Sequence, residues 1–186
     1  MFTSPFTMCI IGATGSGKTQ FLMQFLSNCK KLINPPPAHI LYCYGETNSE
    51  VLALRSKGIE IFHGAPSEKQ IKERKKPLLL LMDDLLLDLK TDFLDRLYTR
   101  GSHNWNVSCV LVSQSLFSKT LRVVRSNSHF LVLMRTPASE LQIKTLGSQL
   151  FAGNTKYFME SYKDATENPF TYLVINMHPK LLNTFG

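Results

Sequence analysis

The chain has 186 residues, of which 44% are hydrophobic, a length that suits one domain with a sizeable core and leaves little room for two. Its formal net charge of +7 favours a polyanionic partner, with nucleic acid as the first candidate. No uncharged apolar run approaches the length of a bilayer span and no targeting signal is evident, so we expect no membrane association and a soluble, intracellular protein. The cysteines lie far apart in apolar runs, which favours buried free thiols over disulfides, and the histidines lack the spacing of metal ligands.

The segment from Gly12 to Thr19 fits the phosphate-binding pattern G-x-x-x-x-G-K-[ST]. Residues 8–11 before it are typical of a buried strand, and residues 20–29 after it have the apolar spacing of a helix. Backbone amides of such a loop surround a phosphate, Lys18 reaches the β- and γ-phosphates, and the Thr19 hydroxyl is a ligand for Mg²⁺. The pattern predicts ATP and Mg²⁺ as cofactors, with the nucleotide bound by Gly12, Ala13, Thr14, Gly15, Ser16, Gly17, Lys18, Thr19 and Gln20.

A glycine-rich turn before a surface helix is the alternative, but the complete pattern between a strand and a helix argues against it. Residues 34–37, Asn-Pro-Pro-Pro, then end the first helix. Up to residue 77 the chain predicts a strand, a turn, a helix, a strand and a second helix, at 40–44, 45–48, 49–56, 59–62 and 67–76. Ser67 and Gln70 form a capping box, and the charged residues 72–76 either contact nucleic acid or form a solvated helix face.

Residues 78–84 form an unbroken apolar run that ends in two acids, Asp83 and Asp84. This is typical of a strand buried on both faces that delivers a carboxylate to the carboxyl edge of a parallel sheet. We expect Asp83 to act on Mg²⁺ opposite Thr19, and Asp84 to polarise an attacking water. Two solvated acids at a strand end are the alternative. The upstream phosphate-binding segment favours a pair of acids that hydrolyses ATP.

Residues 92–100 predict a helix that Gly101 closes, and residues 107–113 predict a strand that delivers Gln114. A polar amide at the end of the strand after the paired acids resembles the sensor of the additional-strand class of P-loop ATPases. There the sensor strand lies between the two motif strands, and the amide contacts the γ-phosphate. A lone glutamine in a turn is commonly only a hydrogen-bonded loop residue. Its place in chain order after both motifs favours the sensor.

The rest of the chain predicts three helices and two strands, in the order helix, strand, helix, helix and strand, at 121–125, 129–134, 139–150, 154–163 and 171–177. Strands thus alternate with helices along the chain, which indicates an α/β fold with a mostly parallel central sheet flanked by helices. His178 and Pro179 begin a segment that we expect to leave the domain.

Over nearly its whole length the chain resembles the genome-packaging ATPases of the FtsK-HerA superfamily. It is most similar to the form carried by Maverick/Polinton elements, adintoviruses and virophages, which is related to the poxvirus packaging ATPase. Besides the residues from Gly12 to Phe21, the resemblance is carried by 35–37, 42–46 (Tyr-Cys-Tyr-Gly-Glu), 81–85, 101–103, 113–117, 127–129, 162–166, Pro169 and Tyr172. It implies a RecA-like P-loop NTPase fold of the additional-strand class, with residues 1–186 as a single ATPase domain.

By the same resemblance the protein is a homo-oligomeric ring, a hexamer or pentamer, that pumps double-stranded DNA into a preformed viral capsid. A component of the capsid vertex is then a partner, and the protein works inside the host cell, in the nucleus or cytoplasm, where virions assemble. Ring ATPases also need an arginine finger in the neighbouring subunit's site. Arg100 is the first candidate and Arg122 and Arg125 follow, while Glu46 either lies near the nucleotide or is an exposed turn acid.

Two other functions remain open. A small nucleoside or nucleotide kinase fits the length and the phosphate-binding segment, but the pair of acids and Gln114 favour activation of water, and no arginine-rich lid segment stands between them. An assembly or scaffold protein that binds ATP without useful turnover is the third reading. Release of phosphate in the presence of duplex DNA separates these functions.

Overall fold

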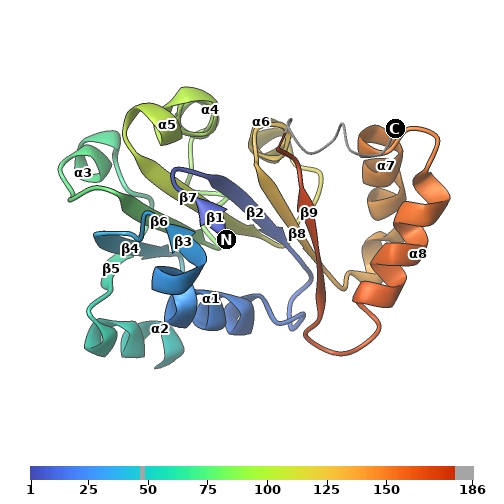
Figure 1. The fold of residues 1–186 in the computed structure, drawn as a ribbon, viewed down its shortest axis with the longest axis horizontal. Helices are drawn as coiled ribbons and strands as arrows, with labels where there is room; N and C mark the ends of the chain where they lie inside the picture. The colour runs from blue at the N-terminus through green and yellow to red at the C-terminus, as the bar shows by residue number, and fades with distance from the viewer. Residues whose placement is uncertain (47–48, 179–186) are drawn as a thin grey trace.

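The computed structural model describes residues 1–46 and 49–178. Its centre is a seven-stranded sheet in which the strand order differs from the chain order (Figure 1). From one edge to the other the strands are β5 (Glu60–His63), β4 (His39–Tyr44), β6 (Leu78–Asp83), β7 (Val107–Ser113), β2 (Thr7–Ile11), β8 (Phe130–Met134) and β9 (Tyr172–Asn176). All neighbouring pairs are parallel except β8 and β9, which are antiparallel. The expectation of a mostly parallel sheet is therefore confirmed.

Helices cover both faces of the sheet because its central strands alternate apolar side chains between two hydrophobic cores. One core lies under α1 (Lys18–Leu32) and α2 (Ser49–Ala53) and contains Met8 and Ile10 of β2. The other contains Cys9 and Ile11 and lies under five further helices, which are α3 (Glu68–Lys72), α4 (Thr91–Arg96), α6 (Lys119–Ser126), α7 (Glu140–Leu150) and α8 (Thr155–Ala165). The four cysteines are buried free thiols, as the sequence predicts.

A two-stranded parallel sheet, β1 (Phe2–Thr3) with β3 (Ile33–Asn34), joins the first residues to the end of α1 and is absent from the sequence-based expectation. Phe2 stacks with Phe6 and meets Phe25 and Phe130 edge to face. Neither strand is long enough to be recognised from its own sequence, because each consists of only two residues.

Gly101 does not close a helix, contrary to the expectation. A π-helical turn (Leu97–Gly101) follows α4 and continues directly into α5 (Ser102–Asn104), and Gly101 has a helical φ of −65°. A side chain at this position would lie 2.9 Å from the Trp105 ring and 3.0 Å from the carbonyl oxygen of Arg96. Glycine is therefore required here for close packing.

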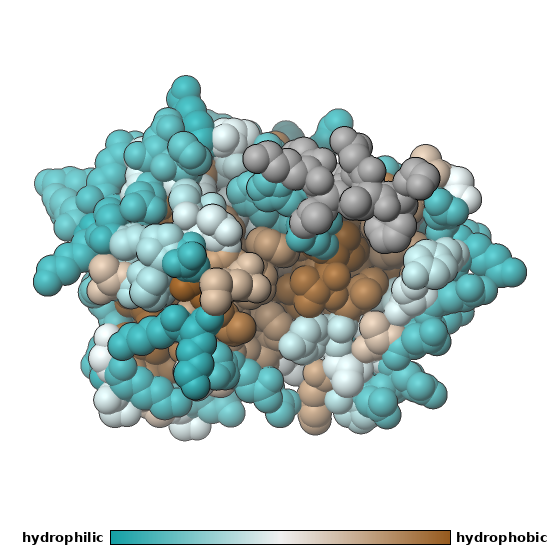
Figure 2. All heavy atoms as spheres, in the orientation of Figure 1, coloured by the Kyte–Doolittle hydropathy of each residue, from teal (hydrophilic) through white to brown (hydrophobic). Residues whose placement is uncertain are grey.

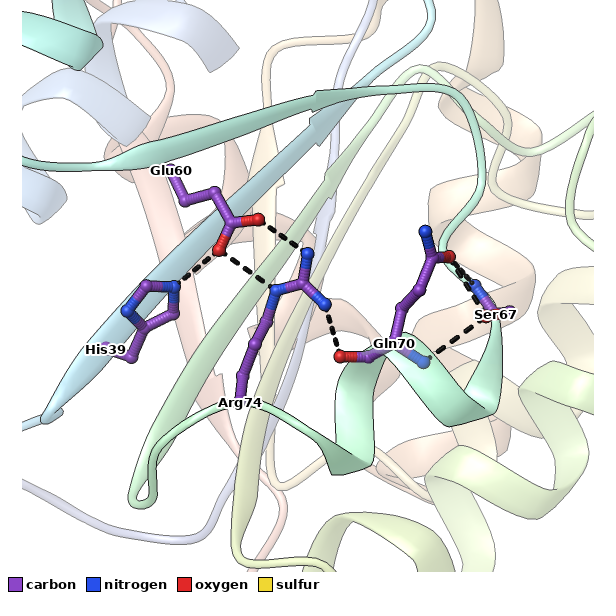
Figure 3. Close-up of polar contacts among 5 residues, drawn as sticks. All are labelled: His39, Glu60, Ser67, Gln70 and Arg74. Atoms are coloured by element: carbon purple, nitrogen blue, oxygen red, sulfur yellow. Dashed lines mark hydrogen bonds and ion pairs between the residues drawn. The ribbon is translucent and has the colours of Figure 1, made fainter.

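The capping box at Ser67 is present, but α3 ends at Lys72, so most of the charged segment 72–76 is not helical. Arg74 instead donates two hydrogen bonds to Glu60 at the start of β5, from Nε at 3.0 Å and Nη2 at 2.5 Å, and one to the carbonyl oxygen of Gln70. His39 at the start of β4 also bonds Glu60, over 2.6 Å, as Figure 3 shows. This cluster joins the edge strand β5 to its neighbour β4. The guanidinium of Arg74 makes its hydrogen bonds within the fold.

On the face of the sheet that α1 packs against, an apolar surface beside β8 and β9 is left open to solvent. Figure 2 shows hydrophobic residues gathered near the middle of this view, where Figure 1 places these strands. Val174 and Tyr172 of β9 are 44% and 37% exposed.

None of the helices in the described ranges 1–46 and 49–178 is long and apolar enough to cross a bilayer.

Candidate active site

The phosphate-binding loop follows β2 and turns directly into α1, so the amino end of that helix faces the loop (Figure 1). Gly17, the residue before the helix, has φ 100°, a left-handed conformation that glycine adopts without steric cost. The loop borders a cavity of about 510 Å³ at the carboxyl edge of the sheet. The cavity is lined by Thr14, Gly15, Gly17, Lys18, Thr19, Gln20, Glu46, Glu50, Asp83, Asp84, Val112, Ser113, Gln114 and Phe170.

Lys18 bends back over the loop, and its ammonium donates hydrogen bonds of 2.8 Å to the carbonyl oxygens of Gly12 and Ala13. Burial lowers the pKa of Lys18, while the charges of Asp83 and Asp84 raise it. The lysine is therefore bonded to the loop and lies near enough to both acids to feel their charges. This is the position expected for a cation that contacts the distal phosphates of a nucleotide.

Asp83, the last residue of β6, is partly buried and accepts a hydrogen bond of 2.5 Å from the Tyr42 hydroxyl on the adjacent strand β4. Burial raises the pKa of Asp83, as does the neighbouring Asp84, whereas the hydrogen bond from Tyr42 and the charge of Lys18 lower it. Tyr42 thus orients one carboxylate oxygen and favours the ionised form that a metal ligand needs. The role of Tyr42 is not predicted from the sequence.

Asp84 leaves the strand direction, as the sequence analysis anticipated. Its φ of 53° is left-handed, a conformation that aspartate tolerates better than most residues, and its side chain is exposed at the cavity. Gly45 makes this turn possible, because a side chain there would lie 2.6 Å from the backbone oxygen of Asp84. The Gly45 amide also donates a hydrogen bond of 3.1 Å to the carbonyl oxygen of Asp83.

Gln114 extends from the end of β7, the strand between β2 and β6, and its Oε1 accepts a hydrogen bond of 3.0 Å from the Thr14 hydroxyl. The loop and this strand are also joined through the backbone, since the Gly12 amide donates to the carbonyl oxygen of Ser113 over 3.2 Å. The strand order predicted for an additional-strand ATPase is therefore present. Gln114 directly contacts the phosphate-binding loop.

The cavity lining brings together Lys18, Thr19, Asp83, Asp84 and Gln114, which come from two strand ends and one helix start. Gln20 also lines it, whereas the buried Gly12 and the half-buried Ala13 and Ser16 do not. Glu46 lines the cavity together with Glu50, which the sequence analysis did not single out. The turn expected at 45–48 lies partly outside the described residues.

The three candidate finger arginines do not line this cavity. Arg100 is exposed in the π-helical turn, and its charge lowers the pKa of Glu68 only after the larger effects of Lys72 and Arg96. Arg125 donates a hydrogen bond of 2.6 Å to the carbonyl oxygen of Leu116, and its guanidinium lies 4.2 Å from the centre of the Phe117 ring. Arg125 is therefore held by its own chain, while Arg122 is exposed on α6.

The described residues contain no group of three or more metal-ligating His, Cys, Asp or Glu side chains. A hydroxyl at Thr19 and a carboxylate at Asp83 are nevertheless hard oxygen donors, which suit Mg²⁺. Mg²⁺ in nucleotide sites usually keeps several waters and uses one or two protein ligands together with substrate phosphates. The residues present fit that ion.

Neither protein-family models nor curated protein sequences match the chain. Among solved structures, the chain is similar to the genome packaging NTPase B204 of Sulfolobus turreted icosahedral virus 2. The sulfate complex of B204 has a TM-score of 0.63 at 11% identity, over 92% of this chain and 91% of B204. The complex of B204 with ATP-gammaS has a TM-score of 0.61 at 12% identity, over 94% and 93%.

ATPases 2 and 3 of EssC from Geobacillus thermodenitrificans are also similar, with a TM-score of 0.51 at 15% identity, over 71% of this chain and 35% of that one. At such identities the likeness shows the fold. The fold is that of a RecA-like P-loop ATPase, as the resemblance in sequence implies.

Proposed function

We propose that this protein is an ATP-hydrolysing motor that packages double-stranded viral DNA into a preformed capsid. The observation that carries the proposal is the meeting of the loop lysine, two differently placed acids and Gln114 in one cavity, with the Gln114 strand between the two motif strands. The likeness in fold to a viral genome packaging NTPase supports the packaging role. We further propose that residues 1–186 act as one ATPase domain.

In this proposal, the amides of the loop and Lys18 hold the triphosphate, and Gln20 lies beside it at the start of α1. Thr19 and Asp83 hold Mg²⁺, which when bound neutralises charge on the β- and γ-phosphates. Asp84 orients and polarises the attacking water, and its exposed carboxylate is free to accept the proton of that water. Gln114 contacts the γ-phosphate. Through its hydrogen bond with Thr14, Gln114 transmits the loss of that phosphate to the loop.

We also propose that the protein acts as a homo-oligomeric ring, a hexamer or pentamer. In the ring, Arg100 of one subunit completes the site of its neighbour by stabilising charge on the transferred phosphoryl group. Arg122 is the alternative finger. Arg125 is excluded from this role, because its hydrogen bond to Leu116 and its contact with Phe117 hold it within its own subunit.

The net charge of +7 supports contact with the DNA backbone, which needs cations and little reading of bases. We infer that this chain is an FtsK-HerA packaging ATPase of the form carried by Maverick/Polinton elements, adintoviruses and virophages. The motor then docks on a component of the capsid vertex, at the site of virion assembly in the nucleus or cytoplasm.

Phosphate release from Mg-ATP, measured with and without duplex DNA, tests the proposal. We expect release by the wild type, stimulation by duplex DNA of unrelated sequences, and no release by Lys18→Ala. Transfer of phosphate to a nucleoside would instead identify a kinase. Tight binding of ATP without release would identify a nucleotide-gated assembly protein, and either result would contradict the motor.

A further inference from the structure

Phe170 is a large aromatic residue whose exposure to solvent and backbone conformation are both unfavourable for such a side chain. It is 56% exposed and has a left-handed φ of 65°, which is a genuine outlier for a bulky side chain. It stands in a turn between α8 and β9, where Thr171 donates to the carbonyl oxygen of Asn168 from its amide over 3.4 Å and from its hydroxyl over 2.7 Å. Strained residues of this kind concentrate at functional sites.

The Phe170 side chain lies against the phosphate-binding loop. A side chain built at Gly17 would lie 2.9 Å from Cδ1 of Phe170 and 3.2 Å from its Cα. Phe170 also lines the same cavity as Lys18 and Asp84. Two residues further on, the ring of Tyr172 meets Phe21 of α1 edge to face, with centroids 4.8 Å apart, which anchors the start of β9 beside the helix. One side of the Phe170 ring therefore packs near the loop while much of the ring remains open to solvent.

The topology places Phe170 at the end of the site opposite to the hydrolytic residues. Asp83, Asp84 and Gln114 follow β6 and β7, which lie on one side of the loop strand β2. Phe170 precedes β9, on the other side of β2. A triphosphate whose terminal phosphate faces Asp84 and whose remaining phosphates follow the amino end of α1 carries its nucleoside toward the β8 and β9 side.

We propose that Phe170 is a stacking platform for the nucleobase of the bound nucleotide. This role rests on the proposed binding of ATP at the same site. An aromatic ring binds a base through its π face, which every base possesses, so the platform favours a nucleoside triphosphate over inorganic triphosphate without selecting strictly among bases. The strained turn holds the ring in place before the nucleotide arrives, which lowers the entropic cost of binding.

Equilibrium binding of Mg-ATP and of inorganic tripolyphosphate, with no turnover required, tests the platform in the full chain. Phe170→Leu keeps an apolar side chain but removes the π face, Phe170→Tyr keeps the ring, and Phe170→Gly removes the ring while relieving the left-handed backbone. We expect Leu and Gly to weaken ATP binding by roughly tenfold, because base stacking on an aromatic residue is typically of that size, and Tyr to preserve it. Binding of tripolyphosphate should not change in any variant.

The Phe170→Gly variant separates this role from a structural one, since its thermal midpoint should equal or exceed that of the wild type. Unchanged ATP affinity in the Leu and Gly variants would overturn the platform. An equal loss of tripolyphosphate affinity would overturn it as well, because Phe170 would then act by shaping the loop. If the wild type binds ATP but does not hydrolyse it, the motor fails while the platform stands, and if the wild type binds neither ligand, both fail.

Discussion

At the scale of single residues, Asp83 and Asp84 show how two adjacent carboxylates acquire different surroundings. Asp83 ends the strand in regular conformation, is partly buried and is bonded by Tyr42. Asp84 turns out of the strand at φ 53°, which is possible because Gly45 leaves room for its backbone oxygen. One carboxylate is thus held in place, which suits its proposed role as a metal ligand, and the other is exposed, which suits its proposed role in activating water.

Asp84→Asn should bind Mg-ATP with nearly wild-type affinity and lose turnover by about 100-fold or more, the range typical of a general base. Asparagine tolerates the left-handed conformation at this position, so the backbone should be retained. Steady-state phosphate release and nucleotide titration measure the two quantities. Asp88→Asn, at an exposed acid a few residues on, is the matched control and should retain activity. Wild-type hydrolysis by Asp84→Asn would show that another group activates the water.

Tyr42→Phe should shift the pH dependence of activity. The Tyr42 hydroxyl lowers the pKa of Asp83 against the effect of burial, so its removal raises that pKa. Asp83 must be ionised to hold Mg²⁺, and the acidic limb of kcat/KM should therefore move to higher pH, by about one unit. Rate profiles at one fixed, subsaturating concentration of Mg²⁺ measure the limb, and Tyr44→Phe on the same strand serves as the control. An unchanged limb would remove Tyr42 from the site.

At the scale of elements, the sequence predicts well what depends on local pattern. The loop, the buried strand ending in Asp83 and the capping box at Ser67 are all present, because each is encoded within a few neighbouring residues. Contacts between segments that are distant in the chain are not predicted by the sequence. Nothing in the local sequence around Arg74 or Phe170 shows that the first pairs with Glu60 and the second lies on Gly17, since these contacts form only when the chain is folded.

At Gly101, helix propensity and side-chain packing have opposite effects on the stability of a Gly101→Ala variant. Replacement of a helical glycine by alanine normally gains about 0.5–1 kcal/mol, but overpacking typically costs about 1–3 kcal/mol. With Trp105 only 2.9 Å from an added methyl group, we expect Gly101→Ala to lower the free energy of unfolding. Denaturant unfolding in a double-mutant cycle with Trp105→Leu measures the coupling. A stabilised Gly101→Ala protein, or an equal loss in both backgrounds, would contradict this packing.

At the scale of the whole molecule, the proposed hydrolytic residues share one cavity, and the proposed finger arginines do not line it. Asp84 and Gln114 face the cavity, whereas Arg100 and Arg122 are exposed away from its lining. An exposed arginine with no place in its own site is available to a neighbour. This arrangement suits a ring in which hydrolysis requires two subunits. The sequence alone could not separate Arg125 from the other two candidates, because its hydrogen bond to Leu116 is a tertiary contact.

Mixtures of Arg100→Ala and Lys18→Ala subunits should hydrolyse ATP although each variant alone is inactive. In a mixed ring, an Arg100→Ala subunit retains its own loop lysine and receives the intact Arg100 of a Lys18→Ala neighbour. Phosphate release across a series of mixing ratios measures the rescue. Lack of rescue at every ratio, with rescue by Arg122→Ala in place of Arg100→Ala, would assign the finger to Arg122.

We propose that hydrolysis drives movement along double-stranded DNA. Displacement of a third strand from a DNA triplex tests this coupling, because a translocating ring removes the strand only after it has moved along the adjoining duplex. We predict displacement by the wild type that requires Mg-ATP and a duplex arm, and none by Asp84→Asn. Hydrolysis at full rate in the presence of duplex DNA, without displacement from any triplex substrate, would show that the protein is not a DNA translocase.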